Sequence, residues 1–277
     1  MMTALVEEPA ASRPFSRRQL LRTAAKVARV LGIILILCAI WETVCRLTGV
    51  RPYIFPSPAN VLHELIADPF YLLENSAYTI GASLLGFALS VVIGLTMAVG
   101  IVYSKFLDST LLTTLVASNA VPKVAIAPLF ILWVGTGIES KVLMALLVSI
   151  FPMVVDSVVG LRSADPGMLE LARTYKGSTL QMFWKIRFPN ALPSIFAGMK
   201  VAISLSLIGT IVGEFVGSNR GLGYVILQSQ GTYNTSRVFA TILLLTAIGI
   251  VYYQVVDLIE RKAMPWHVTH RHLEDED

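Results

Sequence analysis

Long apolar runs alternate with polar segments along the chain, and six of the runs reach the length of a membrane-spanning helix. A helix needs about 20 apolar residues to cross the hydrocarbon core of a bilayer. The runs lack the ten-residue alternation of a membrane β-barrel. Because lipid requires every backbone polar group to be bonded internally, the pattern predicts an all-α, polytopic membrane helical bundle. The six expected spans are residues 28–48, 79–102, 111–134, 141–161, 194–216 and 238–258.

The polar stretches divide the chain into three parts. Residues 1–27 form a basic tail, which we expect to be disordered or to lie at the membrane interface. Residues 28–260 form the membrane domain, and residues 261–277 form a second tail. The histidines of this second tail are more typical of a solvated segment than of a metal site, so no metal is expected.

The distribution of Lys and Arg predicts the direction of the spans. If both termini are cytoplasmic, 15 of these residues lie on the cytoplasmic side and four lie outside. Cytoplasmic loops are enriched in Lys and Arg, so both termini are expected in the cytoplasm. The longest internal polar segment, residues 162–192, carries five of the cytoplasmic charges and lies between the fourth and fifth spans.

Two short helices are predicted within this internal segment. The first begins at Asp165 and Pro166, which are typical of a helix start with a capping side chain and a proline in the first turn. It is expected to run to Lys176. The second, residues 179–188, is expected to end where Pro189 follows it. Apolar and aromatic residues on such a loop indicate a protein contact or a face that lies on lipid headgroups.

The segment resembles the cytoplasmic EAA loop of permease subunits of ATP-binding cassette (ABC) importers. The family pattern is Glu-Ala-Ala, then Gly, then Ile-x-Leu-Pro further along. This chain has Glu170-Leu171-Ala172 and Ile186-Arg187-Phe188-Pro189 at the expected separation. It departs from the pattern at Lys176, the position where the family usually has Gly, and Gly177 follows one residue later.

The resemblance implies that residues 165–176 form a coupling helix that docks in a groove of a separate ATPase subunit. Gly177 would act as a hinge and Glu170 as a polar contact. The alternative is a loop that only joins two spans. The implied ATPase-coupling loop includes Glu170, Leu171, Ala172, Lys176, Gly177, Ile186 and Pro189.

Further resemblance covers nearly all of the chain from residue 50 onward. Phe55-Pro56-Ser57-Pro58, Trp133-Val134-Gly135-Thr136-Gly137 and Gly221-Leu222-Gly223-Tyr224 are similar to the permeases that import nitrate, sulfonates, taurine and related small molecules. This similarity implies the type I ABC importer permease fold in the bacterial cytoplasmic (inner) membrane. The implied partners are a second permease copy in a homodimer, a substrate-binding protein and ATPase subunits. ATP and Mg would be bound by the ATPase, so no cofactor and no catalytic residue is expected in this chain.

Charged residues inside the spans are candidates for a translocation pathway, because intramembrane charge is costly and tends to face a bundle interior or a wet cavity. The candidates are Lys123, Asp156 and Glu214. Pro122 and Pro128 interrupt backbone hydrogen bonding in the third span, so that span is expected to line the pathway. For Glu214 the alternative is structural pairing with a Lys or Ser of a neighbouring helix.

The composition agrees with a membrane protein and excludes several other classes. Of the 277 residues, 55% are hydrophobic and 14% are charged, and the mean hydropathy is +0.69. The basic residues are scattered rather than gathered on one face, which argues against nucleic-acid binding despite a net charge of +4. The glycine-rich stretch 217–223 has no phosphate-binding GxxxxGK[ST] pattern, so it is expected to form tight turns.

Two other functions are compatible with a six-span bundle. An ion-coupled secondary transporter would use Lys123, Asp156 and Glu214 as a coupling site and would need no ATPase. A membrane anchor for a complex would tolerate loss of those charges. Neither function explains the pattern of residues 170–189.

Overall fold

The structure, a computed structural model, describes residues 17–265, apart from the side chains of residues 17–27, 30, 31 and 112. Every regular element within that range is a helix. The α-helices are α1 (Arg17–Thr48), α2 (Pro58–Ala67), α3 (Pro69–Tyr103), α4 (Lys105–Leu107), α5 (Thr113–Asn119), α6 (Ala127–Val134), α7 (Ile138–Arg162), α8 (Pro166–Thr174), α9 (Thr179–Met182), α10 (Phe188–Gly217), α11 (Leu222–Gly231) and α12 (Thr235–Ala263). Three short turns complete them: the π-helical η1 (Asp108–Leu112) and η3 (Phe183–Arg187), and the 3₁₀-helical η2 (Lys123–Ile126).

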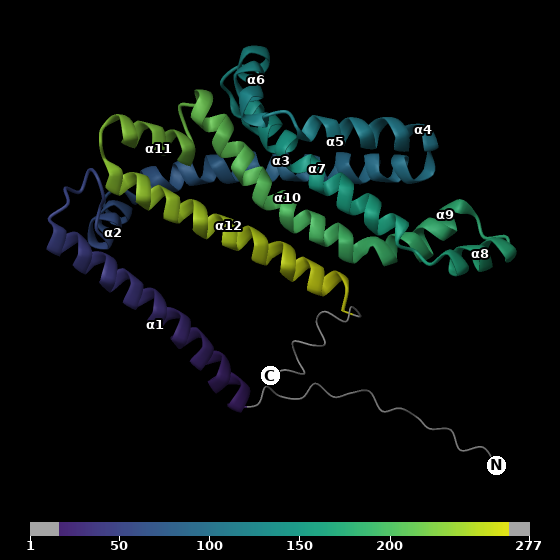
Figure 1. Cartoon of the computed structure of the whole chain (residues 1–277), viewed down its shortest axis with the longest axis horizontal. Helices are drawn as coiled ribbons and strands as arrows, with labels where there is room; N and C mark the ends of the chain where they lie inside the picture. The colour runs from purple at the N-terminus through teal and green to yellow at the C-terminus, as the bar shows by residue number, and fades with distance from the viewer. Residues whose placement is uncertain (1–16, 266–277) are drawn as a thin grey trace.

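The centre of the bundle consists of α3, α7 and α10, which lie against one another (Figure 1). Small residues permit the close approach. A Cβ on Gly86 of α3 would lie 2.9 Å from the Val142 carbonyl oxygen of α7, and one on Gly209 of α10 would lie 2.7 Å from the Met144 carbonyl oxygen. Gly, Ala and Ser at helix contacts let backbones pack closely without a hydrophobic driving force between helices.

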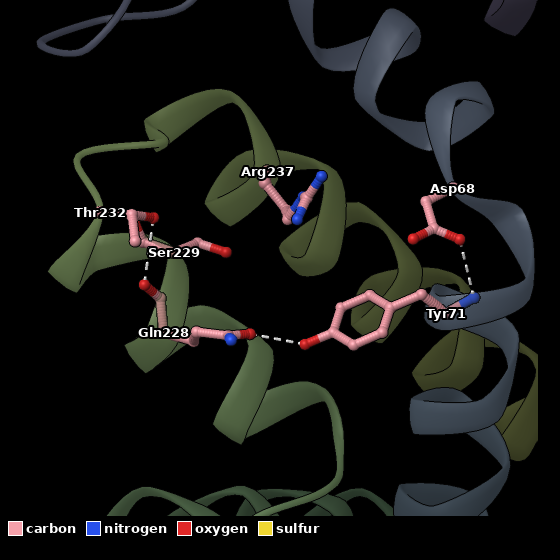
Figure 2. Close-up of a pocket in the computed structure, with 6 residues that line it drawn as sticks. All are labelled: Asp68, Tyr71, Gln228, Ser229, Thr232 and Arg237. Carbon is pink, nitrogen blue, oxygen red and sulfur yellow. Dashed lines mark hydrogen bonds between the residues drawn. The ribbon is translucent and has the colours of Figure 1, made fainter.

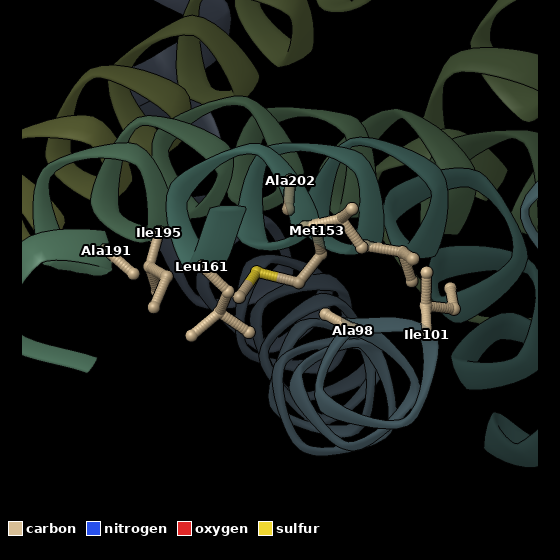
Figure 3. Close-up of a cluster of buried hydrophobic side chains, with 9 residues drawn as sticks. Ala98, Ile101, Met153, Leu161, Ala191, Ile195 and Ala202 are labelled. Carbon is tan, nitrogen blue, oxygen red and sulfur yellow. The ribbon is translucent and has the colours of Figure 1, made fainter. Parts of the chain in front are cut away.

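A buried apolar cluster joins these three helices (Figure 3). Its members come from α3, α7 and α10, so the cluster stabilises their mutual packing through dispersion contacts. The labelled residues are Ala98, Ile101, Met153, Leu161, Ala191, Ile195 and Ala202.

The remaining long helices lie outside this centre. Helix α12 packs on α10, α11 and α2, and α1 contacts α2 (Figure 1). Three aromatic rings also connect α1 to α12: Trp41 lies with its centroid 5.6 Å from that of Phe55 and 5.9 Å from that of Phe239.

Within residues 17–265, four single helices are long and apolar enough to cross a membrane: α3, α7, the continuous stretch Thr179–Gly217 that contains α10, and α12. They contain four of the six expected spans. The expected span 111–134 is not one helix. It is bent by 92° between Lys105–Asn119 and Lys123–Val134, so a fifth crossing would consist of a bent pair. Pro122 lies in the break, where it donates no backbone N–H and cannot continue the helix.

The first expected span, 28–48, lies within α1. Helix α1 is not among the helices that meet the length and hydropathy of a membrane span in the described residues, so the count of six spans stays a prediction. Helix α1 begins at Arg17 and therefore extends into the stretch expected as the basic tail. Residues 1–16 and the histidines at 267, 270 and 272 lie outside the described residues.

The short helices α2 and α11 lie outside the expected spans and were not predicted. Both lie at the same end of the bundle, whereas α8 and α9 project from the opposite end (Figure 1). We refer to these as the α11 end and the α8 end. Helix α2 begins with Ser57, whose hydroxyl accepts a hydrogen bond from the Asn60 N–H, followed by a proline in the first turn. This is a common helix-start signal.

Candidate functional site

The α8–α9 segment, residues 165–189, is the most protruding part of the α8 end (Figure 1). The Asp165 carboxylate caps α8 as expected and accepts hydrogen bonds from the N–H groups of Gly167 (2.6 Å) and Met168 (3.2 Å). These bonds satisfy two N–H groups that have no partner within the helix, and they place a negative charge at the positive end of the helix dipole.

Helix α8 ends in a Schellman motif. The Lys176 N–H donates to the Arg173 carbonyl (2.9 Å), and the Gly177 N–H donates to the Ala172 carbonyl (2.9 Å). The left-handed residue of the motif is Lys176, with φ 57°, and not the glycine after it. Gly177 is needed for space instead, because a Cβ there would lie 2.9 Å from the Ala172 carbonyl oxygen. The expected coupling helix therefore ends at Thr174, two residues early.

One face of α8 carries apolar side chains that are open to the surroundings. Met168, Leu171 and Tyr175 are 57%, 59% and 80% exposed. Their spacing of three and four residues places them on one side of the helix. Glu170 is also exposed, and Ala172 is half-buried. Exposed contiguous apolar groups of this kind are typical of a protein contact surface.

The second helix of the segment was expected to end before Pro189, but the chain stays helical from Thr179 to Gly217, so that prediction was wrong. A capping box starts α9: the Ser178 hydroxyl accepts from the Gln181 N–H, and the Gln181 side chain accepts from the Ser178 N–H. The chain then continues through η3 into α10. In η3 the Phe188 N–H bonds to the Phe183 carbonyl, five residues back. This wider turn accommodates Pro189, which lacks an N–H and would clash with a regular preceding turn.

The base of the segment is tied to two helices of the bundle centre. The Arg187 guanidinium donates to the Leu161 carbonyl at the end of α7 (3.0 Å) and lies over the Tyr103 ring of α3, 5.7 Å from its centroid. The Asn190 amide donates to the Ser163 hydroxyl just after α7 (3.0 Å). Ile186 and Pro189 are half-buried beside these contacts. The sequence pattern gave no indication of these cross-helix bonds.

The three candidate pathway residues do not meet in one place. Lys123 is half-buried in η2, and its ammonium lies 5.8 Å from the centroid of the Phe151 ring. Asp156 is half-buried on α7 beside Gly198, where a Cβ would lie 2.9 Å from the Asp156 Cβ. Glu214 lies near the α11 end and is 1% exposed.

Glu214 is the centre of a buried polar network. Its carboxylate accepts hydrogen bonds from the Thr79 hydroxyl (2.8 Å) and from the Gly223 N–H in the first turn of α11 (2.7 Å). Two further bonds join α3 to the same turn: the Gly221 N–H donates to the Asn75 amide oxygen (2.7 Å), and the Leu222 N–H donates to Thr79 (2.8 Å). Its hydrogen bonds come from Thr79 and a backbone N–H rather than from the Lys or Ser that the sequence suggested, although Lys141 of the neighbouring helix α7 is near enough for its charge to attract the carboxylate.

Lys141 provides a second buried connection at this end. Its side chain is fully buried, and its ammonium donates to the carbonyls of Gly217 (2.6 Å) and Thr136 (2.7 Å). Gly217 is the last residue of α10, so the cation lies at the negative end of that helix. Among residues 17–265, no three His, Cys, Asp or Glu side chains are placed to hold a metal ion.

Known proteins resemble this chain over most of its length. A permease from Haemophilus influenzae, described as a probable ABC transporter permease protein, is 36% identical over 84% of this chain and 95% of its own length. The formylaminopyrimidine transport permease ThiX of Halalkalibacterium halodurans is 33% identical over 84% and 93%. Permeases named for aliphatic sulfonates, taurine and nitrate are 32%, 26% and 28% identical.

The fold agrees with that of a solved ABC transporter. A chain of the MetNI methionine transporter in an inward-facing conformation aligns with a TM-score of 0.63 at 18% identity and covers 72% of this chain and 98% of its own. Residues 90–264 match the family described as the binding-protein-dependent transport system inner membrane component. The chain therefore belongs to this family of ABC importer permeases and has the type I permease fold.

Proposed function

We propose that this chain is the permease subunit of an ABC importer, driven through the α8–α9 segment by separate ATPase subunits that bind ATP and Mg. The observation that carries the proposal is the exposed apolar face of α8, which stands on a base bonded to α7 and α3. A segment that only joined two spans would need neither feature. The α8 end would face the cytoplasm, with both termini on that side, in the inner membrane of a bacterium.

The exposed face of α8 has the chemistry of a helix that docks in a groove. Met168, Leu171 and Tyr175 supply apolar anchors on successive turns, as in other amphipathic helices that bind apolar grooves. Glu170, which is exposed one residue before Leu171, would make a polar contact with the ATPase, so a reversal of its charge would oppose docking.

Movement of the docked helix would reach the bundle through Arg187. Its guanidinium bonds to the last turn of α7 and lies over a ring of α3, so a shift of the α8–α9 segment pulls on two helices as well as on α10, which follows directly in the chain. Alternating access requires such a connection between the ATPase and the pathway.

The transported solute is proposed to be small and to be delivered by a substrate-binding protein at the α11 end. Relatives are named for sulfonates, taurine and nitrate, and also for formylaminopyrimidine and riboflavin. Lys123, in the bend between α5 and α6, is proposed to face the pathway of a homodimer, where its charge would suit an anionic group. Asp156 and Glu214 would contribute through structure rather than by contact with the solute.

Affinity purification of the detergent-solubilised chain from its native membrane tests the proposal. An ATP-binding subunit is expected with the wild type and is expected to be lost with Glu170→Lys and Leu171→Asp. The matched control is Glu74→Lys, a charge reversal at a residue whose side chain is 69% exposed at the α11 end. Recovery of intact wild-type chain without any ATP-binding subunit would contradict the proposal and favour a secondary transporter.

The orientation has its own test. A cysteine at Ser178, which is exposed in the α8–α9 segment, is expected to react with a membrane-impermeant reagent only after the cells are opened. Labelling in intact cells would reverse the topology.

A further inference from the structure

A polar pocket of about 230 Å³ opens at the α11 end, between the first turns of α3 and α12 and the last turn of α11 (Figure 2). Liquid water occupies about 30 Å³ per molecule, so the pocket has room for a small organic molecule. Its lining residues are Asp68, Tyr71, Gln228, Ser229, Thr232 and Arg237.

The walls of the pocket are fixed by bonds behind them. The Tyr71 hydroxyl donates to the Gln228 side chain (2.6 Å) and so joins α3 to α11. The Arg237 Nε donates to the Glu64 carboxylate of α2 (2.9 Å), and this bond leaves the terminal nitrogens of the guanidinium for another partner. Asp68 accepts from the Tyr71 N–H through one carboxylate oxygen. The pocket is therefore preorganised by three helices and their caps.

Two polar groups of the lining are available to hydrogen-bond a ligand. Ser229 is only 3% exposed, and its hydroxyl points into the pocket (Figure 2). Because it lines the pocket, this hydroxyl is available to a ligand there. The second carboxylate oxygen of Asp68 is also free to accept.

The charges of the lining specify both ends of a ligand. Figure 2 shows Asp68 and Arg237 on different walls, with Ser229 and Gln228 across from Asp68. Asp68 offers a carboxylate, Ser229 and Gln228 offer hydroxyl and amide donors across from it, and the Arg237 guanidinium lies between them in this view. We propose that this pocket binds a small zwitterion, with its ammonium on Asp68 and its oxyanion on Arg237 and Ser229. This inference names a class of solute that would bind at the α11 end, and it therefore rests on the proposed import function.

The charges around the pocket predict an order of affinity among possible ligands. Glu64 already offsets Arg237 from behind, so Asp68 leaves an excess negative charge around the pocket. A zwitterion should bind best, a simple ammonium compound less well, and a simple anion least, because the anion gains no partner for Asp68. This order distinguishes the site from an unspecific cationic patch, which would prefer the anion.

The test is equilibrium binding of radiolabelled taurine to the full-length chain in lipid nanodiscs, with ethylamine and ethanesulfonate as competitors. Saturable binding is expected, and unlabelled taurine should compete at least about ten-fold better than either single-charge compound. Asp68→Asn, which keeps an acceptor for the Tyr71 N–H, and Ser229→Ala should each weaken binding by about ten-fold. Glu74→Gln, at an exposed residue that does not line the pocket, should bind as the wild type does.

Absence of saturable taurine binding to the wild type overturns the proposal. So does wild-type affinity in both pocket variants, provided that their melting temperatures match the wild type, or equal competition by ethanesulfonate. Because no ATPase is present in this assay, its failure leaves co-purification through α8 unaffected. Loss of co-purification would in turn leave taurine binding in place, so the two proposals fail separately.

Discussion

The backbone N–H of Gly223 lies 2.7 Å from a carboxylate oxygen of Glu214, so the first turn of α11 is bound to the last turns of α10. The second carboxylate oxygen accepts from Thr79 of α3. A negative side chain at a helix N-terminus is favourable because the first N–H groups of a helix are unpaired and carry partial positive charge. One buried carboxylate thus holds three helices together at the α11 end.

Removal of that carboxylate should destabilise the protein strongly. Glu214→Ala leaves the Gly223 N–H buried without its acceptor and leaves the Thr79 hydroxyl only the longer bond to the Asn75 carbonyl (3.2 Å), which should cost about 2 kcal/mol. Glu214→Gln keeps an acceptor oxygen and should cost less. Thermal unfolding of the purified protein measures both, with Glu74→Ala at an exposed position as the control. Equal melting temperatures for Glu214→Ala and the wild type would contradict the structural role.

The turn beside Glu214 should accept no side chain at Gly221. This residue has φ 103°, a conformation that L-residues rarely adopt, and a Cβ there would overlap the Glu214 carboxylate. Gly221→Ala should therefore lower the melting temperature by several degrees, corresponding to about 2 kcal/mol or more. Gly81→Ala in α3 is the matched control, because a Cβ there meets nothing within 4 Å. It should be neutral or stabilising by about 0.5–1 kcal/mol.

The long helices could be predicted from the sequence because their apolar length follows from the thickness of a membrane. The positions at which these helices break could not be predicted. Pro122 and Pro189 have the same chemistry, yet the chain bends by 92° near the first and remains helical through the second. The difference arises from the π-helical turn before Pro189, which depends on tertiary contacts such as that of Arg187 with Leu161.

The candidate site was predictable only in its local part. Asp165 and Pro166 form a helix-start signal that can be recognised from the local sequence alone. Glu214 stands out in the sequence as a carboxylate in an apolar run. The partner of Glu214, Thr79, lies 135 residues earlier in the chain. Helical periodicity shows that Asn75 and Thr79 share a face, but it does not show which turn they meet.

The end of α8 should become more stable with glycine at position 176. Lys176 occupies the left-handed position of the Schellman motif, which costs an L-residue roughly 1 kcal/mol that glycine does not lose. Lys176→Gly should therefore slow hydrogen exchange of the Gly177 amide, which bonds to the Ala172 carbonyl. Lys176→Val, whose branched Cβ disfavours this conformation, should accelerate it. Faster exchange in the glycine variant would exclude the motif as the helix end.

The ion pair behind the pocket should make stability depend on pH. Burial alone would raise the pKa of Glu64, but hydrogen bonds from Asn234 and Arg237 outweigh it, and the pKa lies below its usual range. The charge of Arg237 and that of the adjacent His63 act in the same direction. Because the folded pKa is below the unfolded value of about 4.3, the stabilisation is complete above that value and is lost as the pH falls through the folded pKa.

Acid titration of the melting temperature measures this contribution. Glu64→Gln should be less stable than the wild type at pH 7, and the difference should shrink below about pH 4, where the wild-type carboxyl becomes protonated. Glu74→Gln, at an exposed residue, should follow the wild-type curve throughout. A constant difference between Glu64→Gln and the wild type from pH 7 to pH 3 would show that the ion pair contributes no pH dependence.

Arg187 should affect coupling without affecting docking, since its contacts lie at the base of the α8–α9 segment and not on the exposed face of α8. Arg187→Ala removes the bond to the Leu161 carbonyl and the contact with the Tyr103 ring, so movement of α8 would no longer be passed directly to α7 and α3. In proteoliposomes with the co-purified ATPase and binding protein, solute imported per ATP hydrolysed should fall several-fold while the ATPase remains bound. Arg187→Lys keeps the charge but lacks the planar fork, so it should restore coupling only in part. Lys185→Ala, an exposed residue in the same turn, is the control and should leave the ratio unchanged. An unchanged ratio in Arg187→Ala would show that α10 alone carries the movement.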